Sequence, residues 1–446
     1  MLSAPDADLS LRDPDLPGLP LLLDPVALGQ ELAQHLSQVQ DDSIDLTATY
    51  LRYKPRTSCL AAYHLHIAGT QLDLYAKAFR PAAWDKLRKG FDRPAMPPPH
   101  PLDTGPGRIL LPNLAIVLRL FPNDKRLKSL ARLGAADSRR TLLHRVFPAH
   151  PELWSADVHM LSYKPERRYV GQALLGEESR AVLKFYTEGG YRAAKVNAKG
   201  FNSRGLLRIA TQLGHSDRHR ILAFEWVCGQ LLANALYSSQ LAPGDVQNVG
   251  AALAELHAQK PKRLYHLTRR VEIDALLTLA SWIGFVCPPV AGQARHLSAS
   301  LAERLDARPQ LYRPIHGDFY AKQVLLNSNN VSILDLDEAV LSDPSADLGL
   351  FVAHMERDVL YGKLSNEVIE PVKEAMLEGY RANGGQQVTD GDVALYTAIG
   401  LLKLSPHPFR TRQPEWPQQI DTILQRAEEL LNSNAPHVSG YRYGPI

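Results

Sequence analysis

Two neighbouring stretches decide how this sequence is interpreted: IHGDFYAKQVLL at residues 315–326 and VSILDLDEAVLSDPSADLG at residues 331–349. In the first stretch an aspartate, Asp318, follows a His-Gly pair, and an amide side chain, Gln323, stands five residues later. The second stretch carries another aspartate, Asp335, at the end of a short apolar run. Each of these three features is common by itself, whereas all three in this order and at this spacing are a strong signal of a functional site.

The apolar runs 324–326 and 331–334 flank the turn residues Asn-Ser-Asn-Asn, and this pattern predicts a small hairpin. Such a hairpin would bring Gln323 and Asp335 beside Asp318. Transfer of a phosphoryl group needs a carboxylate that orients the attacking hydroxyl and accepts its proton, and oxygen ligands that hold magnesium against the phosphates. Because this catalysis is mostly positioning and charge stabilisation, a few such side chains are enough for it.

Length and composition predict a globular protein of two or three packed units. The chain has 446 residues, too many for one ordinary core, and 45% of them are hydrophobic and 22% charged. A formal net charge of +3 gives no electrostatic reason to expect nucleic acid or an acidic membrane as the main partner.

Cysteine usage and the N-terminal residues predict a soluble, cytoplasmic protein. The cysteines Cys59, Cys228 and Cys287 are far apart and form no CxxC pair, which favours a reducing compartment and argues against disulfides or structural zinc. The N-terminus carries acidic residues where an export signal carries basic ones, and no run of about 18 apolar residues predicts a membrane span.

A similar pattern occurs twice in the N-terminal half. Each copy begins with Leu-x-Tyr-Lys-Pro, continues with alternating apolar residues that predict antiparallel strands, and ends in a strand that carries a lysine, Lys77 or Lys184. The opening segments are residues 51–55 and 161–165, and the helices predicted after the lysine strands are residues 81–89 and 191–200. The pattern predicts one strand-rich unit used twice, with a chance match as the open alternative.

The rest of the chain contrasts with these two units. Between them, short strands are expected within 108–118 and a basic helix from Asp124, and the proline-rich stretch 94–106 is expected to be a loop or linker. From about Pro243 the apolar residues follow a helical period, which predicts a helical C-terminal unit. Its helices are expected at residues 246–259, 271–283, 291–305, 368–381 and 416–431.

Asp318, the downstream amide and the run from Asp335 to Leu348 resemble the catalytic and metal-binding loops of the aminoglycoside phosphotransferase and choline kinase-like superfamily, relatives of protein kinases that phosphorylate small molecules. The resemblance covers about residues 158–431 and implies an α/β (α+β) fold of the bilobal protein-kinase-like kind. It implies three domains: a strand-rich cap that resembles a duplicated N-lobe, the N-lobe itself and a helical C-lobe, at residues 1–150, 151–235 and 236–446.

The resemblance also implies roles for individual residues. Asp318 would be the catalytic base, and Asp335 a principal magnesium ligand. Asp347 would brace the catalytic loop, and His316 would pack within it.

The metal ligands depart from the superfamily in one place. Its metal-binding amide is usually asparagine, whereas this sequence has Gln323. Glutamine keeps the carbonyl oxygen but adds a methylene, so that ligation stays possible with a changed geometry. Asp337 is a second candidate ligand that would compensate.

The resemblance places a lysine of the N-lobe on the phosphates of the nucleotide. Lys184 is preferred to Lys77 because its copy directly precedes a hinge-like strand at residues 224–227, in which Glu225 and Val227 would bind the nucleotide. The alternative is that Lys184 is a solvated lysine of an edge strand.

Two further departures concern this nucleotide site. The helix at 191–200 holds no glutamate to pair with the lysine, and the nearest acid is Glu188. There is also no GxGxxG loop. Arg167 and Arg168 occupy the turn that would cover the phosphates, either as phosphate ligands or as solvated arginines.

Three other features have weaker interpretations. His354 lies in an apolar helical segment and is expected to be a hydrogen-bonded core histidine. Residues 407–410 are candidates for lining an acceptor pocket. The basic stretch 195–220 is expected to be a charged surface rather than an anion site.

Together these observations predict a cytoplasmic kinase that uses ATP and Mg²⁺ to phosphorylate a hydroxyl of a sugar, an amino alcohol or an aminoglycoside-like compound. The N-terminal domain would cap or scaffold the acceptor site and could bind a protein partner, while no nucleic-acid or membrane partner is expected. The alternative is a nucleotide-binding pseudokinase or regulatory interaction protein. Gln323 and the missing glutamate favour that alternative, and the presence of both Asp318 and Asp335 disfavours it.

Overall fold

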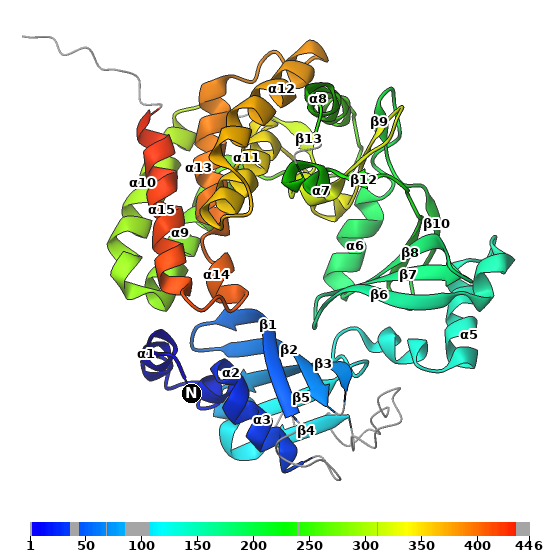
Figure 1. The fold of residues 1–446 in the computed structure, drawn as a ribbon, viewed down its shortest axis with the longest axis vertical. Coiled ribbons are helices and arrows are strands. Elements are labelled where there is room, and N and C mark those ends of the chain that lie inside the picture. Colours follow the sequence, from blue (N-terminus) through cyan, green and yellow to red (C-terminus); the bar gives the residue numbers. More distant parts are fainter. Residues whose placement is uncertain are drawn as a thin grey trace, which may run out of the picture.

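Three units lie around a common centre in a computed structural model of the chain (Figure 1), which describes residues 2–35, 44–67, 69–84, 107–238, 241–309 and 311–433. Two strand-rich units are followed by a helical one, so that the expected mixed α/β fold, with a strand-rich N-lobe, a helical C-lobe and an extra strand-rich unit before them, is confirmed. The boundaries expected at residues 150 and 235 stay predictions.

The first unit is an antiparallel sheet with three short helices before it. Its strands follow the order β1-β2-β3-β5-β4: β1 (Ile44–Lys54), β2 (Ser58–Ile67), β3 (Thr70–Phe79), β5 (Ile116–Leu120) and β4 (Arg108–Leu111). The helices were not expected from the sequence: α1 (Ala4–Arg12), α2 (Leu19–Leu23) and α3 (Pro25–Ala33). A short 3-10 helix, η2 (Pro81–Ala83), begins where a helix was predicted, and the rest of that prediction and the predicted linker at 94–106 lie outside the described residues.

The second unit repeats this architecture. Its five antiparallel strands follow the order β10-β11-β8-β7-β6: β10 (Gln212–Ser216), β11 (Ile221–Glu225), β8 (Glu178–Tyr186), β7 (Arg168–Leu175) and β6 (Asp157–Lys164). One face is covered by α5 (Ala136–Val146), whose Leu142, Leu143 and Val146 join the core beneath the sheet. The other face carries α6 (Glu188–Asn197).

Two helix predictions in this region were wrong in their bounds. The basic helix expected from Asp124 is a 3-10 helix, η4 (Lys128–Leu133), followed by α5. The reason is that the Asp124 carboxylate accepts the N–H groups of Arg126 and Leu127 and so forms a turn there. The helix expected at 191–200 begins at Glu188, so that the glycines after Glu188 lie inside it.

The helical unit contains the five predicted helices, with ends that differ by a few residues. They are α8 (Pro243–His257), α9 (Arg269–Val286), α10 (Ala291–Asp306), α12 (Ile369–Ala382) and α15 (Trp416–Ser433). The described residues of this unit also form α7 (Leu232–Tyr237), α11 (Ser345–Leu360), α13 (Asp390–Leu404) and α14 (His407–Arg410). At Gly349 a Cβ atom would lie 2.5 Å from Tyr396, so glycine permits the close approach of α11 and α13.

The predicted catalytic hairpin is confirmed. Its strands β14 (Val324–Leu326) and β15 (Val331–Ile333) pair antiparallel in a small sheet with two other short strands, β12 (Gln230–Leu231) and β9 (Leu207–Arg208). Just before and after the hairpin, β13 (Arg313–Ile315) pairs with β16 (Val340–Ser342). The two pairings fix both ends of the segment that carries Asp318 and Asp335.

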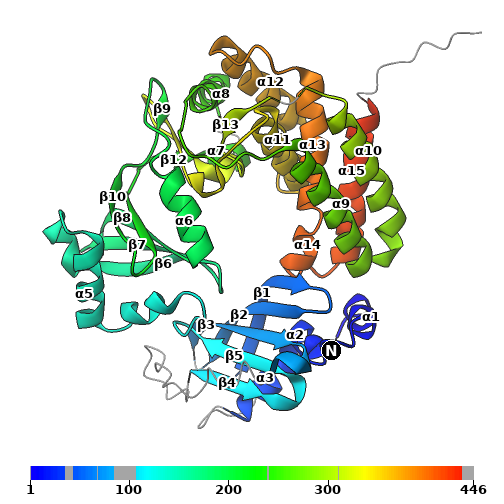
Figure 2. The same ribbon diagram turned by 180° about the vertical axis from the view of Figure 1, so that it is seen from behind.

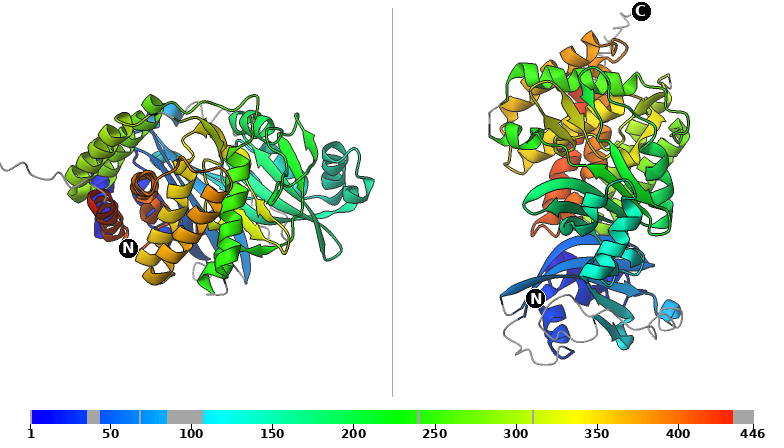
Figure 3. Two further views of the ribbon diagram at one scale, coloured as in Figure 1. Left: turned by 90° about the horizontal axis from the view of Figure 1, so that it is seen from above. Right: turned by 90° about the vertical axis from the view of Figure 1, so that its right-hand side faces the viewer.

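The first unit contacts both of the others, as the views from behind and from the side show (Figures 2 and 3). Its contact with the helical unit is largely apolar: Tyr53 packs against Phe285 and Phe409, and its backbone oxygen accepts the indole N–H of Trp282. Arg412 adds an ion pair with the buried Asp6. No helix within the described ranges is both long enough and apolar enough to cross a bilayer.

Candidate active site

The loop between β13 and β14 carries Asp318 in a fixed backbone. The buried carboxylate of Asp347, at the start of α11, accepts the backbone N–H groups of His316 at 2.6 Å and Gly317 at 2.9 Å. Gly317 has a φ of 82°, and a Cβ atom there would lie 2.3 Å from the Glu338 carbonyl oxygen, so only glycine fits.

The imidazole of His316 ties this loop to the hairpin. Its Nε2 lies 2.7 Å from the Leu334 carbonyl oxygen, and its Nδ1 accepts the N–H of Asp318 at 3.2 Å. Because Nδ1 accepts this bond, Nε2 carries the ring proton that it donates to the Leu334 carbonyl oxygen. Behind Asp347, His257 contacts the same carboxylate at 3.0 Å and thereby closes the network.

The carboxylate of Asp318 makes no hydrogen bond or ion pair with any residue that the structure describes. Burial raises the pKa of Asp318, and the carboxylates of Asp335 and Glu338 raise it further, while His316 and Lys164 oppose them. A carboxylate that is uncommitted and more basic than usual suits the acceptance of a proton.

The carboxylates of Asp335 and Asp337 converge on two cations of the second unit. Lys184 Nζ lies 2.7 Å from Oδ1 of Asp335 and 3.3 Å from Oδ1 of Asp337, and Arg168 Nη1 lies 3.0 Å and 2.8 Å from the same two residues. Burial alone would raise the pKa of Asp335, but the Lys184 and Arg168 cations outweigh it and hold that pKa well below its usual range. Asp335 has a left-handed backbone, with φ 63° and ψ 55°, which turns its side chain toward the sheet.

Lys184 therefore pairs with the candidate metal ligands and not with an acid of α6. Glu188, the acid nearest to it in the sequence, forms ion pairs with Arg192 and Arg220 on the surface. Sequence reasoning left the role of Arg168 open, and the structure places its guanidinium at the acid pair, whereas Arg167 is exposed and lies 3.8 Å from Glu338.

Asn197 is a residue of the site that sequence reasoning missed. Its buried amide, at the end of α6, donates to the carbonyl oxygens of Leu336, Asp337 and Ala339 at 3.0–3.1 Å. It thus fixes α6 to the loop that carries the acid pair. A polar residue on the buried face of an amphipathic helix was the only signal for it.

The remaining predicted site residues lie at the margins of this constellation. Gln323 is buried, and its backbone pairs with Tyr320 and Leu334, so that it stands at the base of the hairpin. Glu225 ends β11, where Arg208 and the N–H of Thr211 hold its carboxylate. Val227 follows in the connection to the helical unit.

Two carboxylates and a nearby amide fit magnesium, which usually takes one or two carboxylates and completes its shell with waters and substrate phosphates. Among the described residues, no group of three or more His, Cys, Asp or Glu side chains could hold a metal by itself. The convergence of Asp335 and Asp337 on two cations shows that the position attracts positive charge. The residues therefore fit Mg²⁺ bound together with phosphate.

The turn between β6 and β7 lies against the first unit. Glu166, which is 3% exposed and has a φ of 56°, donates its N–H to Asp124 Oδ2 at 2.7 Å. Its carboxylate pairs with Lys77 at 2.5 Å and Arg52 at 3.5 Å, both from the first unit. Lys77, the counterpart of Lys184 in the first copy, thus holds the turn that precedes Arg168.

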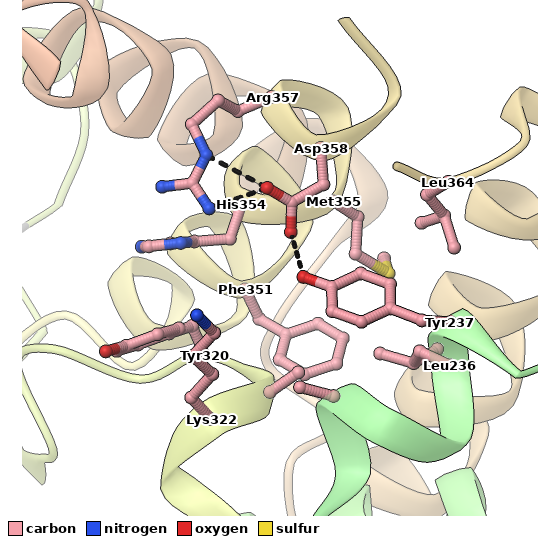
Figure 4. Close-up of a pocket in the computed structure, with 12 residues that line it drawn as sticks. Leu236, Tyr237, Tyr320, Lys322, Phe351, His354, Met355, Arg357, Asp358 and Leu364 are labelled. Carbon is pink, nitrogen blue, oxygen red and sulfur yellow. Dashed lines mark hydrogen bonds and ion pairs between the residues drawn. The ribbon is translucent and has the colours of Figure 1, made fainter. Parts of the chain in front are cut away.

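The expectation of a hydrogen-bonded His354 was wrong. Its Nδ1 is buried and has no hydrogen-bond partner among the described residues. The ring instead stacks on Tyr320, with centroids 4.3 Å apart and planes at 14° (Figure 4). The cause is that α11 presents His354 to the catalytic loop, where stacking on the tyrosine takes the place of a hydrogen bond. In the basic stretch at 195–220, Lys195 pairs with Asp217 and Arg220 with Glu188.

Comparison with known proteins gives one family. Residues 172–384 match the model described as the phosphotransferase enzyme family, APH. The resemblance to this superfamily, expected from the sequence, is confirmed, and the match supports a small-molecule phosphotransferase. A search of curated proteins found no match.

Several solved structures are similar at low identity. One is a choline/ethanolamine kinase family protein from Mesorhizobium loti, with 16% identity and a TM-score of 0.46 over 66% of this chain and 94% of that one. A thermostable mutant of aminoglycoside phosphotransferase APH(4)-Ia in ternary complex with AMP-PNP and hygromycin B has 15% identity and a TM-score of 0.49 over 68% of this chain and 99% of that one. The choline kinase LicA from Streptococcus pneumoniae has 16% identity and a TM-score of 0.45 over 62% of this chain and 93% of that one. All three are distant, and we base the function on the family match and on the geometry of the site.

Proposed function

Since residues 172–384 match the phosphotransferase enzyme family, we propose that the chain is a cytoplasmic, ATP-dependent and Mg²⁺-assisted kinase that phosphorylates a hydroxyl of a small molecule. One observation carries the proposal. Two cations of the second unit, Lys184 and Arg168, meet the acid pair of the helical unit, Asp335 and Asp337, next to the uncommitted carboxylate of Asp318. Cationic phosphate ligands, metal ligands and a base thereby come together from two units.

In the proposed reaction Asp318 accepts the proton of the acceptor hydroxyl. The hydroxyl oxygen forms a bond to the γ-phosphorus as the bond from that phosphorus to the bridging oxygen of ATP breaks, and ADP leaves with the electron pair. Lys184 and Arg168 move from the carboxylates toward the phosphates, since both groups compete for the same cations. Mg²⁺, held by Asp335 with Asp337 and Gln323, would supply charge neutralisation on the phosphates.

The other predicted residues act by position. Asp347 and His316 hold the backbone of the catalytic loop, so that Asp318 points to one place. Glu225 and Val227 would bind the nucleotide from the connection between the two lobes. The first unit acts as a scaffold, because Glu166 binds its Lys77 and Arg52 and so fixes the turn next to Arg168.

A pseudokinase or regulator is the second candidate, and one observation favours it. Lys184 has no glutamate partner in α6, and the candidate metal ligands are neutralised by protein cations. In such a protein nucleotide would bind without transfer, and Asp318→Asn would change nothing that can be measured.

Thermal unfolding with ATP and magnesium tests the proposal first. A ligand at about 100 times its dissociation constant should stabilise the folded chain by about 2.7 kcal/mol. We expect magnesium-dependent stabilisation in the wild type and its loss in Asp335→Ala, with Asp274→Ala as a surface control. Absence of stabilisation at millimolar ATP in the wild type would refute ATP as the donor. Stabilisation without ADP formation over a broad panel of hydroxylated compounds would favour the regulator.

A further inference from the structure

A group of polar side chains lines the helical unit beside the catalytic loop. We define the α11–α14 wall as His354 and Arg357 of α11, Tyr361 at its end, and His407 and Arg410 of α14. Tyr320, two residues after Asp318, stacks on His354 and so connects the wall to the catalytic base (Figure 4). Burial raises the pKa of Tyr320, and the carboxylates of Asp318 and Asp335 raise it further.

Three polar atoms of the wall have no hydrogen-bond partner in the described part of the chain. They are Nδ1 of His354, Nδ1 of His407 and the hydroxyl of Tyr361, and all three are buried. Buried polar atoms nearly always have a partner, so each such exception needs an explanation. Burial lowers the pKa of both imidazoles, and the neighbouring Arg357 cation lowers it further, so that the positive charge of the wall comes from its arginines and not from its histidines.

Arg410 is the strongest indication of a ligand. Its guanidinium lies over the Trp282 ring at 5.5 Å and, among the described residues, forms no hydrogen bond or ion pair. Burial lowers the pKa of Arg410, Tyr50 opposes that shift, and the Arg167 cation lowers the pKa further. Arg167, on the turn of the second unit, thus acts electrostatically on Arg410, and it also lies 3.8 Å from the Glu338 carboxylate.

The acids nearby are committed elsewhere. Asp358 accepts two hydrogen bonds from Arg357, at 3.1 Å and 2.7 Å, and one from the hydroxyl of Tyr237 at 2.6 Å (Figure 4). The narrow cavity behind Tyr320, of about 20 Å³, has room for a water but not for a substrate. This cavity is therefore not the acceptor site.

We propose that the α11–α14 wall binds an anionic group of the acceptor, a carboxylate or a phosphate ester, so that a hydroxyl of the same molecule faces Asp318. A largely buried arginine without a partner is unfavourable, and its planar fork matches both kinds of anion. The inference rests on the proposed function and deepens it, because it names the acceptor class. A cationic amino alcohol or aminoglycoside would meet like charge at Arg410 and Arg167, so of the acceptors considered from the sequence, an acidic sugar fits best.

Calorimetric titration of the full chain, saturated with AMP-PNP and Mg²⁺, tests this site with three probes: inorganic phosphate, glycolate and ethanolamine. We expect at least one anion to bind with a 1:1 ratio, and ethanolamine not to bind. Tighter binding of phosphate identifies a phosphate ester as the recognised group, and tighter binding of glycolate identifies a carboxylate. If neither anion binds in the millimolar range, or if ethanolamine binds more tightly than both, the proposal is wrong.

Two variants assign the bound anion to the wall. Arg410→Gln should weaken the affinity for the anion at least tenfold, whereas the affinity of the exposed control Arg270→Gln should stay within twofold of the wild type. Equal affinity in Arg410→Gln and the wild type would overturn the assignment. If Arg410→Gln does not fold, Arg410→Lys keeps the charge and the packing on Trp282 but loses the fork, and a threefold or greater loss is then expected, with no loss as the contrary result.

The same titration separates this inference from the proposed function. If AMP-PNP does not bind, the kinase proposal fails, but the nucleotide-free chain can still be titrated with phosphate and glycolate. An anion that binds there and is lost in Arg410→Gln supports the wall as an anion site without the kinase. An anion that binds equally in both chains lies elsewhere and refutes it.

Discussion

Replacing Glu166 with glutamine should uncouple the first two units while it keeps the size of the side chain. Glu166 is 3% exposed, and its partners Lys77 and Arg52 are 16% and 26% exposed. Burial lowers the pKa of Lys77, and the Glu166 carboxylate opposes that shift. Without the carboxylate, the buried ammonium of Lys77 has no compensating charge.

The expected loss of unfolding free energy is about 3 kcal/mol. Removing one partner of a buried ion pair costs about 3 to 5 kcal/mol, and the lower end applies because the glutamine oxygen can still accept a hydrogen bond from Lys77. Lys77→Met should cost a similar amount, since it leaves Glu166 buried with only the more distant Arg52. The double variant removes both charges and should lose at least about 2 kcal/mol less than the sum of the two.

Urea unfolding of the four proteins, followed by tryptophan fluorescence, measures this coupling. Glu188→Gln is the matched control, because Glu188 is 57% exposed in its pairs with Arg192 and Arg220 and should contribute less than about 1 kcal/mol. If the unfolding free energy lost by the double variant equals the sum of the two single losses within about 0.5 kcal/mol, the reasoning is refuted. They would mean that Lys77 and Glu166 are each solvated in solution.

Three further outcomes follow from the site. Asp318→Asn should lower the rate of phosphotransfer by on the order of 100-fold to 10,000-fold, with nucleotide affinity unchanged; an unchanged rate would remove Asp318 from the reaction. Asn197→Ala strands three carbonyl oxygens and should lower the unfolding free energy by about 1 to 3 kcal/mol, and a loss within error would show that water replaces the amide. Burial lowers the pKa of His407 from 6.5 to about 4. The neutral ring therefore contributes fully to the unfolding free energy above pH 6.5, and up to about 3 kcal/mol is lost as the pH falls to 4. Urea unfolding at pH 7.5 and pH 5 should show a smaller change in unfolding free energy between the two pH values for His407→Gln than for the wild type.

Local patterns predicted the parts of the fold that rest on local physics. Two short apolar runs on either side of the Asn-Ser-Asn-Asn turn are sufficient for the hairpin of β14 and β15, and the helical period of apolar residues located α8, α9 and α10 to within a few residues. The order of Asp318, Gln323 and Asp335 was sufficient to suggest the family. Their roles stay predictions, and the structure adds the contacts that each of them makes.

Other elements have no local signal. Helix α13 is buried on nearly all sides, so its sequence DVALYTAIGLL is apolar all round and shows no amphipathic period. The contact of Glu166 with Lys77, and that of Arg168 with the acid pair, join residues far apart in the sequence, and each arginine or glutamate there looks like an ordinary surface residue. His354 was expected to be a hydrogen-bonded core histidine, whereas its ring stacks on Tyr320.

The contact of the first unit with both lobes has a mechanical consequence. Two lobes joined by one connection can rotate about it, but a third unit that contacts both lobes restricts this rotation. Its contact with the helical unit is apolar, around Tyr53 and Phe409, and its contact with the second unit is charged, between Lys77 and Glu166. We therefore expect nucleotide exchange to require release of the charged contact, and to become faster when Glu166→Gln removes it.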